Sequence, residues 1–300
     1  MKISLGPIYF YWPKQKVFDF YKNIAQSSVD IVYLGEVICS KRNELKLEDW
    51  LEIAEQLTES GKEVVLSTLT LLEADSELKR LSRICKESDY LVEANDFSAI
   101  NVMSKQQKPF VVGPSVNMYN AASLNILAEK GLKRWCFPVE LSRNTLAGIL
   151  PDKDERIEVE VFAFGKLPLA FSARCFTARA YDLDKDDCQY KCIKHKDGLL
   201  LSTKEDQSFL IMNGIQTMSS DTFNLINEID EMQSMGVDVV RISPQSENTE
   251  KVIEVFKQRI NGEIDQESAV GYLADLSADL QCDGYWHEQA GMGRMELLTQ

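Results

Sequence analysis

Three cysteines lie close together in an irregular, polar stretch of the chain, where a role as small buried apolar side chains is hard to sustain. Cys175, Cys188 and Cys192 have the spacing C-x12-C-x3-C. The x3 pair can direct both sulfurs at one metal centre, and the longer loop can bring in the third. A closed site needs a fourth ligand, and Cys39, which follows a predicted strand, is the candidate. These four cysteines predict a metal centre.

Four thiolates suit either zinc or an iron–sulfur cluster. Zinc modules usually pair two C-x2–4-C knuckles, whereas this chain has only one loose pair. The run from Cys188 to His195 resembles the cysteine loop of radical enzymes that use S-adenosylmethionine, but His195 stands where that loop has its third cysteine, which argues against it. The remaining cysteines are predicted to pack as small apolar side chains: Cys85, Cys136 and Cys282.

Eight short β-branched or aromatic runs alternate with amphipathic stretches such as Lys46–Ser60, which Gly61 ends. This alternation predicts a parallel sheet. Eight strands favour a (β/α)8 barrel over a doubly wound sheet, because no Gly-rich nucleotide loop follows the first strand. The predicted strands are Ile3–Ile8, Asp30–Gly35, Glu63–Thr68, Asp89–Glu93, Pro109–Pro114, Arg134–Val139, Arg156–Phe164 and Val237–Pro244.

The alternation breaks after the seventh strand. We predict one barrel domain over residues 1–300, with an insertion at residues 166–207 that carries three of the cysteines and a tail at residues 263–300. A stretch this long without clear helices is typical of a functional segment. Helices are predicted at Asp75–Ser88, Asp221–Met235 and Thr249–Asn261. In such a barrel the ends of strands 2 and 7 open onto the same face, which would bring Cys39 to the other three.

Several side chains are expected at this barrel mouth because they follow predicted strands. They include the aromatic run Tyr9–Trp12, which either grips a planar ligand or a partner protein, or plugs the space under the barrel loops. The polar ones are Glu36, Glu93, Asn95 and Glu140. Of the two histidines, His195 is expected to be solvated between lysines, and His287 to pack the aromatic tail on the barrel.

Composition restricts the class of partner. The chain has 300 residues and a formal net charge of -14, so a nucleic-acid phosphate backbone is not expected as its partner. No apolar run approaches the roughly 20 residues of a membrane span, and Pro7 interrupts any signal-peptide core. We therefore expect a cytoplasmic protein without a membrane span.

Longer motifs resemble those of the collagenase-like peptidase family, and within it the branch that serves ubiquinone biosynthesis. Glu160–Gly165 fits the opening E-x-F-x-x-G of the family signature. The signature then expects a cysteine at the position of Pro168, so the peptidase nucleophile of the signature is missing. The resemblance to the branch covers nearly the whole chain and rests on Leu5–Pro7, Tyr11–Pro13, Gly35–Arg42, Phe164–Cys175, the Cys188–Cys192 pair and Gly284–His287.

The resemblance implies a 4Fe–4S cluster on Cys39, Cys175, Cys188 and Cys192. It implies a heterodimer with a homologous protein, UbiU, in which this chain is the iron–sulfur subunit of an oxygen-independent hydroxylase acting on the ring of a ubiquinone precursor. Two alternatives remain: a non-catalytic iron–sulfur scaffold or electron-transfer partner of UbiU, and a collagenase-like peptidase, which Pro168 disfavours. Catalytic residues are not assigned. A partner contact through Tyr11, Trp12 or Trp286 is expected from the aromatic runs.

Overall fold

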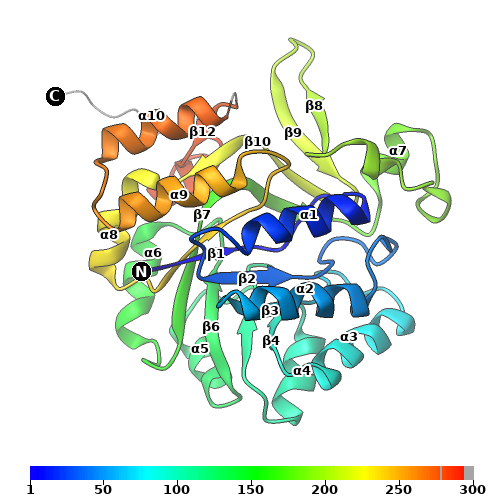
Figure 1. Ribbon diagram of the computed structural model, residues 1–300, viewed down its shortest axis with the longest axis horizontal. Coiled ribbons are helices and arrows are strands. Elements are labelled where there is room, and N and C mark those ends of the chain that lie inside the picture. The colour runs from blue at the N-terminus through cyan, green and yellow to red at the C-terminus, as the bar shows by residue number, and fades with distance from the viewer. Residues whose placement is uncertain (278, 294–300) are drawn as a thin grey trace.

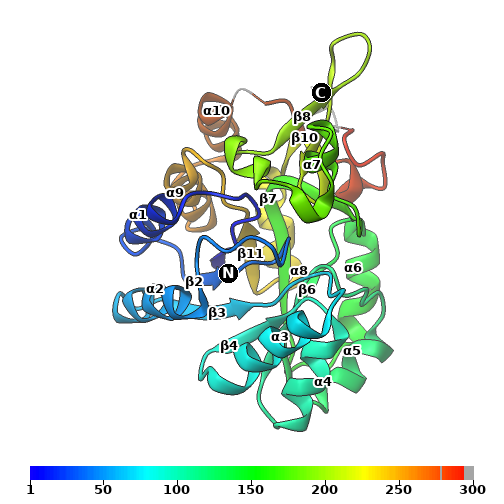
Figure 2. The same ribbon diagram turned by 90° about the vertical axis from the view of Figure 1, so that its right-hand side faces the viewer.

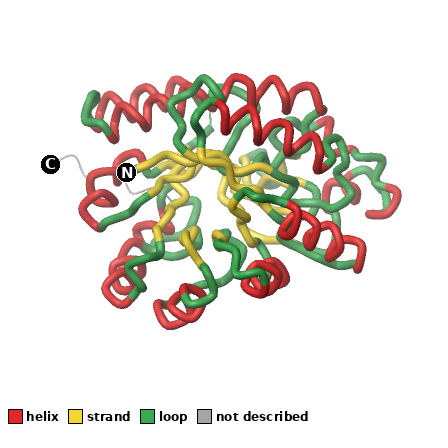
Figure 3. The backbone as a smooth tube through the Cα atoms, turned by 60° about the horizontal axis from the view of Figure 1, so that its bottom comes forward, coloured by secondary structure: helices red, strands yellow, loops and turns green. Residues whose placement is uncertain are grey.

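A computed structural model describes residues 1–277 and 279–293. Its core is a closed ring of eight parallel strands, in which β11 pairs with both β1 and β7. Figure 3 shows the strands at the centre with helices around them. The predicted (β/α)8 barrel is confirmed. The barrel strands are β1 (Lys2–Leu5), β2 (Ile31–Leu34), β3 (Glu63–Ser67), β4 (Leu91–Ala94), β5 (Phe110–Val112), β6 (Leu132–Phe137), β7 (Glu158–Phe171) and β11 (Val239–Ile242).

The helices that cover the strands are amphipathic, as their sequences predict. In α2 (Leu47–Glu59), Trp50, Ile53 and Leu57 are buried against the barrel, and Gly61 follows the helix at φ +85°, where glycine carries no steric penalty. The others are α1 (Lys14–Ile24), α3 (Asp75–Glu87), α4 (Phe97–Lys105), α5 (Ala121–Ala128), α6 (Arg143–Ile149), α8 (Ile229–Met235), α9 (Thr249–Ile260) and α10 (Gln266–Leu276).

The segment between β7 and β11 differs from the prediction in two places. β7 continues through residues 166–171, so these belong to a strand that runs out of the barrel. The predicted helix at Asp221–Met235 is wrong in its first part, because β10 (Gln216–Asn224) occupies it and pairs antiparallel with β7. β9 (Ser208–Asn213) and β8 (Leu199–Ser202) extend this ladder. Figures 1 and 2 show the β8–β9 hairpin rising above the barrel.

The three insertion cysteines lie between β7 and β8, in residues 172–198. This stretch holds the five-residue helix α7 (Phe176–Ala180) and two 3-10 turns, Lys185–Asp187 and Lys191–Lys194. The predicted tail at residues 263–300 contains α10, the short strand β12 (Gln281–Cys282) and a 3-10 turn at Gly284–His287. Positions 278 and 294–300 of that tail lie outside the described residues.

The side chains of the aromatic run Tyr9–Trp12 belong to the buried core of the protein. All four side chains are at most 6% exposed, and Trp286 is 2% exposed. The indole of Trp12 donates to the carbonyl of Lys196 at 2.6 Å and so fastens the insertion to the barrel. The expectation that Tyr11, Trp12 or Trp286 anchors a partner is therefore wrong, since these rings have no free surface to offer. Phe10, Tyr11 and Trp12 form the plug under the barrel loops, whereas the buried ring of Tyr9 also lines a pocket at the barrel mouth.

No helix within the described ranges 1–277 and 279–293 is both long and apolar enough to cross a bilayer.

Candidate metal centre and barrel-mouth pocket

The four predicted ligands line one small cavity. Cys39 comes from the loop between β2 and α2, whereas Cys175, Cys188 and Cys192 come from the insertion. All seven cysteines lie in the described part of the chain and are free thiols. Side chains far apart in sequence therefore meet where the spacing and barrel topology predicted. The other lining residues are Lys41, Arg42, Thr177, Ala178, Tyr190, Lys191 and Gly214.

Three hydrogen bonds hold the backbone segments that line the cavity. The thiol of Cys175 accepts a hydrogen bond from the backbone N–H of Ala178 at 3.4 Å, which caps α7. Lys41 Nζ donates to the carbonyl of Lys185 at 2.9 Å and to Asp186 Oδ1 at 2.5 Å. The Cys39 loop and the insertion are thus tied together beside the cavity.

Arg42 is the buried cation of this cavity. Its guanidinium donates to the carbonyl of Tyr9 and to Asn213 Oδ1, both at 2.7 Å, and lies 3.7 Å from a carboxylate oxygen of Glu36. It also interacts with the thiol of Cys192. Glu36, predicted at the barrel mouth, instead accepts hydrogen bonds from the backbone N–H groups of Ile38 and Cys39. A fixed positive charge beside several thiols favours thiolates.

Burial of the thiols acts against the effect of the Arg42 charge on their pKa. It raises the pKa of Cys39 and of Cys192, while Arg42 lowers both. The metal-free thiols of Cys39 and Cys192 are therefore held mainly as S–H groups, and a metal that binds these two must displace their protons. Burial also raises the pKa of Cys85 to about 11 and of Cys282 to about 12. Cys85 and Cys282 belong to the hydrophobic core, as predicted for packing residues, whereas the buried Cys136 lies beside the charged side chains of Arg241 and Glu160.

Four thiols are a donor set that an iron–sulfur cluster takes. Among residues 1–277 and 279–293, no three His, Cys, Asp or Glu side chains are gathered closely enough to hold one metal ion. A cluster keeps its thiolates farther apart, because each cysteine binds a different iron. The four thiols line one shared cavity, with the buried Arg42 beside them, and these are the residues that would hold such a cluster.

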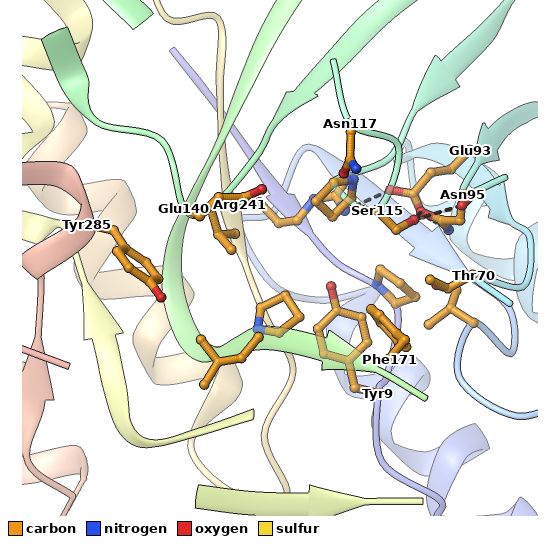
Figure 4. Close-up of a pocket in the computed structure, with 16 residues that line it drawn as sticks. Tyr9, Thr70, Glu93, Asn95, Ser115, Asn117, Glu140, Phe171, Arg241 and Tyr285 are labelled. Carbon is orange, nitrogen blue, oxygen red and sulfur yellow. Dashed lines mark hydrogen bonds and ion pairs between the residues drawn. The ribbon is translucent and has the colours of Figure 1, made fainter. Parts of the chain in front are cut away.

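A second, larger cavity opens at the barrel mouth, with a volume of about 390 Å³. Figure 4 shows its lining side chains. Glu93, Asn95 and Glu140 line it, as their positions after predicted strands suggested. Neither His195, whose ring nitrogen lies 2.8 Å from the hydroxyl of Tyr181, nor the half-buried His287 is among its lining residues.

Below the mouth lies a buried network of charges. Arg241 donates through Nε to Glu160 at 2.7 Å and through Nη1 to Glu93 at 2.8 Å. Its guanidinium stacks on Tyr33, 4.1 Å from the ring centroid, and the Tyr33 hydroxyl donates to Glu160 at 2.5 Å. Burial raises the pKa of Glu160, but Arg241 and Arg134 lower it further, so it lies below its ordinary value. The Glu160 carboxylate is therefore held ionised by the two arginines.

Sequence reasoning missed both Arg42 and Arg241. A signal existed for Arg241, because it is the one charged residue in the strand Val239–Ile242, all of which is buried. A charge at an inward position of an otherwise apolar barrel strand indicates a functional or network role. Arg42 carries no such signal, since it stands in a polar stretch beside Lys41.

Pro168 lines the barrel-mouth pocket. This is the position at which the collagenase-like signature expects a cysteine. None of the described residues that line this pocket is a cysteine. The pocket therefore lacks the thiol that a cysteine nucleophile would supply.

Solved structures with a similar fold differ greatly in sequence. A putative dihydrodipicolinate synthetase from Pseudomonas aeruginosa is 7% identical with a TM-score of 0.47, over 91% of this chain and 80% of that chain. N-acetylneuraminate lyase from Fusobacterium nucleatum is 12% identical with a TM-score of 0.44, over 91% and 79%. A truncated 3-deoxy-D-arabino-heptulosonate 7-phosphate synthase from Thermotoga maritima is 14% identical with a TM-score of 0.44, over 94% and 89%. At these identities the likeness concerns the fold alone.

The family model described as peptidase family U32 matches residues 17–289. The match covers most of the barrel, the whole cysteine cavity, the barrel-mouth pocket except Pro7 and Tyr9, and nearly all of the described tail.

Proposed function

Because this chain belongs to peptidase family U32, we propose that it is a UbiV-like member of that family, the iron–sulfur subunit of an oxygen-independent hydroxylase. Its substrate would be the ring of a ubiquinone precursor, and its partner a UbiU-like homologous protein. The observation that carries the proposal is the meeting of Cys39 with Cys175, Cys188 and Cys192 around one cavity.

The cavity supports a 4Fe–4S cluster on these cysteines. When bound, such a cluster supplies one-electron redox chemistry. The chain's own part is to hold the thiols, to place the Arg42 charge beside them and to enclose the site with the insertion. Enclosure matters because solvent exposure is one of the factors that set a cluster's potential.

Peptidase chemistry receives no comparable support. A cysteine nucleophile must reach the substrate pocket, and Pro168 stands on the pocket wall where the signature has its cysteine. We therefore favour a redox role built on the cysteine cavity over the peptidase activity that the family name suggests.

The test is purification under strict anaerobiosis, followed by iron and sulfide analysis and an absorbance spectrum. We expect about four irons and four sulfides per chain, as the proposed cluster type requires, and a broad band near ~400 nm typical of such clusters. Hydroxylation of the precursor ring is then assayed with and without UbiU. Activity only in the mixture supports the subunit role. A loaded cluster with no activity in either condition would leave a structural or electron-transfer role, and zinc in place of iron would refute the proposal.

A further inference from the structure

The barrel-mouth pocket has the size and walls of a site for a small organic ligand. Its volume of about 390 Å³ lies within the range of small-molecule pockets. It also lies where the carboxyl ends of barrel strands converge, the face on which such barrels bind substrates. The proposed metal centre lies in a separate cavity, so the metal would not occupy this pocket.

Aromatic and polar side chains share the lining of this pocket. The rings of Tyr9 and Phe171 lie side by side in Figure 4, Tyr285 lies apart from them at the far end of the lining, and Asn95 and Ser115 lie together in another part. Prolines and aliphatic side chains complete the apolar lining: Pro7, Val37, Pro114, Val139, Pro168 and Leu169. A flat ligand with oxygen atoms on one edge satisfies both parts, because its faces pack on the rings while its edge forms hydrogen bonds.

A donor at this pocket lacks an acceptor. Arg241 lines the pocket and is fully buried, and its Nη2 has no hydrogen-bond partner within the described residues. Its other two nitrogens are used by Glu160 and Glu93. A buried donor without an acceptor costs free energy, so a ligand oxygen that approaches this guanidinium recovers a hydrogen bond.

The charges around the pocket favour a neutral oxygen over a carboxylate. Arg241 already faces two carboxylates, those of Glu93 and Glu160. Glu140 adds another acidic side chain to the lining. An anionic ligand would meet this acidic surplus, whereas a hydroxyl or carbonyl group gains hydrogen bonds without charge repulsion.

The pocket and the cysteine cavity are lined in part by neighbouring residues of the same two backbone segments. Val37 lines the pocket and Cys39, two residues on, lines the cysteine cavity. At the end of β7, Phe171 lines the pocket, and Cys175, in the segment that follows, lines the cysteine cavity. The same two backbone segments therefore separate the two sites.

From these features we infer that this subunit itself binds the ring that is hydroxylated. The barrel-mouth pocket takes a neutral, planar ring bearing hydroxyl or carbonyl oxygens, packed against Tyr9 and Phe171. Its identity as the hydroxylation substrate rests on the proposed function, but the ligand class rests on the pocket alone.

The experiment measures binding of phenol to the purified chain by ligand-observed NMR and calorimetry, with benzoate and cyclohexanol as comparison probes. We expect phenol to bind at one site and more tightly than either probe. Phe171→Ala removes a wall and should weaken phenol binding roughly 3- to 10-fold. The matched control is Phe209→Ala, whose ring lies on the exposed hairpin away from the pocket and whose loss should leave binding unchanged.

Val139→Phe offers a second variant, which fills the pocket from a half-buried position and should abolish binding. Circular dichroism confirms that each variant is folded. Failure of phenol to bind, equal binding by wild type and Val139→Phe, or a preference for benzoate would each overturn the inference.

Failure of the proposed function gives a different pattern. Wild-type protein that binds phenol but carries no iron after anaerobic purification supports the pocket and refutes the iron–sulfur subunit. Protein with a full cluster that binds no phenol does the reverse. Cys175→Ala separates the two sites within one chain, since it should lose iron and keep phenol binding.

Discussion

Cys39 reaches the insertion cysteines only because the barrel closes, and no local pattern links them. Spacing identified Cys175, Cys188 and Cys192 directly, whereas Cys39 required the topological argument that strands 2 and 7 end on one face. Arg42 escaped prediction because its role depends on Tyr9 and Asn213, contacts that exist only in the folded chain. At the residue scale, sequence thus predicts the reactive groups better than the charges that tune them.

Removing any one of the four cysteines should remove most of the bound iron, because three thiolates cannot complete the proposed site. Iron per chain after anaerobic purification measures this. Cys136→Ala is the control: its thiol is enclosed in the barrel core, so its loss should cost about 1 kcal/mol of unfolding free energy and no iron. Full iron in Cys175→Ala would contradict the ligand assignment.

Arg42→Met should lower the reduction potential of the loaded protein, because the positive charge that stabilises the more negative, reduced cluster is gone. It should also cost about 1–3 kcal/mol of unfolding free energy, since Asn213 Oδ1 and the Tyr9 carbonyl lose their donor. Arg42→Lys keeps the charge but not the forked hydrogen bonds. A redox titration should place the Lys variant nearer to wild type than the Met variant, and equal potentials for Met and wild type would refute the electrostatic role.

At the scale of elements, periodicity predicted the eight barrel strands well and the extension of β7 poorly. Gly165 and Pro168 interrupt that strand, and both residue types normally argue against a strand interior. The structure accommodates Pro168 where the pairing with β10 is irregular, between register shifts at Met218. The predicted helix includes residues 221–224, which in the structure belong to β10. The pairing of β10 with β7 is a long-range contact that no short window of sequence contains.

Gly35 shows how tightly the elements are fitted. It follows β2 at φ +140°, and a Cβ there would lie 2.5 Å from the carbonyl oxygen of Ser67 at the end of β3. Gly35→Ala should therefore destabilise the chain by about 1–3 kcal/mol. Denaturant unfolding measures the change.

Gly148→Ala is the matched control, since a Cβ there meets nothing within 4 Å and the residue lies inside α6. It should stabilise the chain by about 0.5–1 kcal/mol. Equal effects of the two substitutions would show that the approach of β2 to β3 does not depend on Gly35.

At the scale of the whole molecule, the barrel leaves one prominent apolar projection. Leu200, Leu201 and Phe209 are 49%, 44% and 43% exposed on the β8–β9 hairpin, which Figures 1 and 2 show standing clear of the helices. With the aromatic runs buried, this hairpin is the better candidate for contact with the proposed UbiU-like partner. Exposed apolar side chains grouped on one element are typical of protein interfaces.

Phe209→Lys should weaken association with the UbiU-like partner at least about 10-fold, because it places a charge in an apolar contact. Size-exclusion chromatography with light scattering on the mixture measures this. Ile126→Lys is the control, since Ile126 is 62% exposed on α5, at the other end of the molecule from the hairpin in Figure 1. Unchanged association of the Phe209 variant would exclude the hairpin as the contact.

The pairing of β11 with both β1 and β7 has a consequence for synthesis on the ribosome. The barrel closes only when β11 pairs with β1 and β7, and residues 172–238 must be translated before it emerges. At about 5–20 residues per second, that interval lasts several seconds. Throughout it the free edges of β1 and β7 remain open to pairing with other nascent chains. The insertion that carries the cysteines therefore delays closure, and chaperone supply during expression should govern the yield of soluble protein.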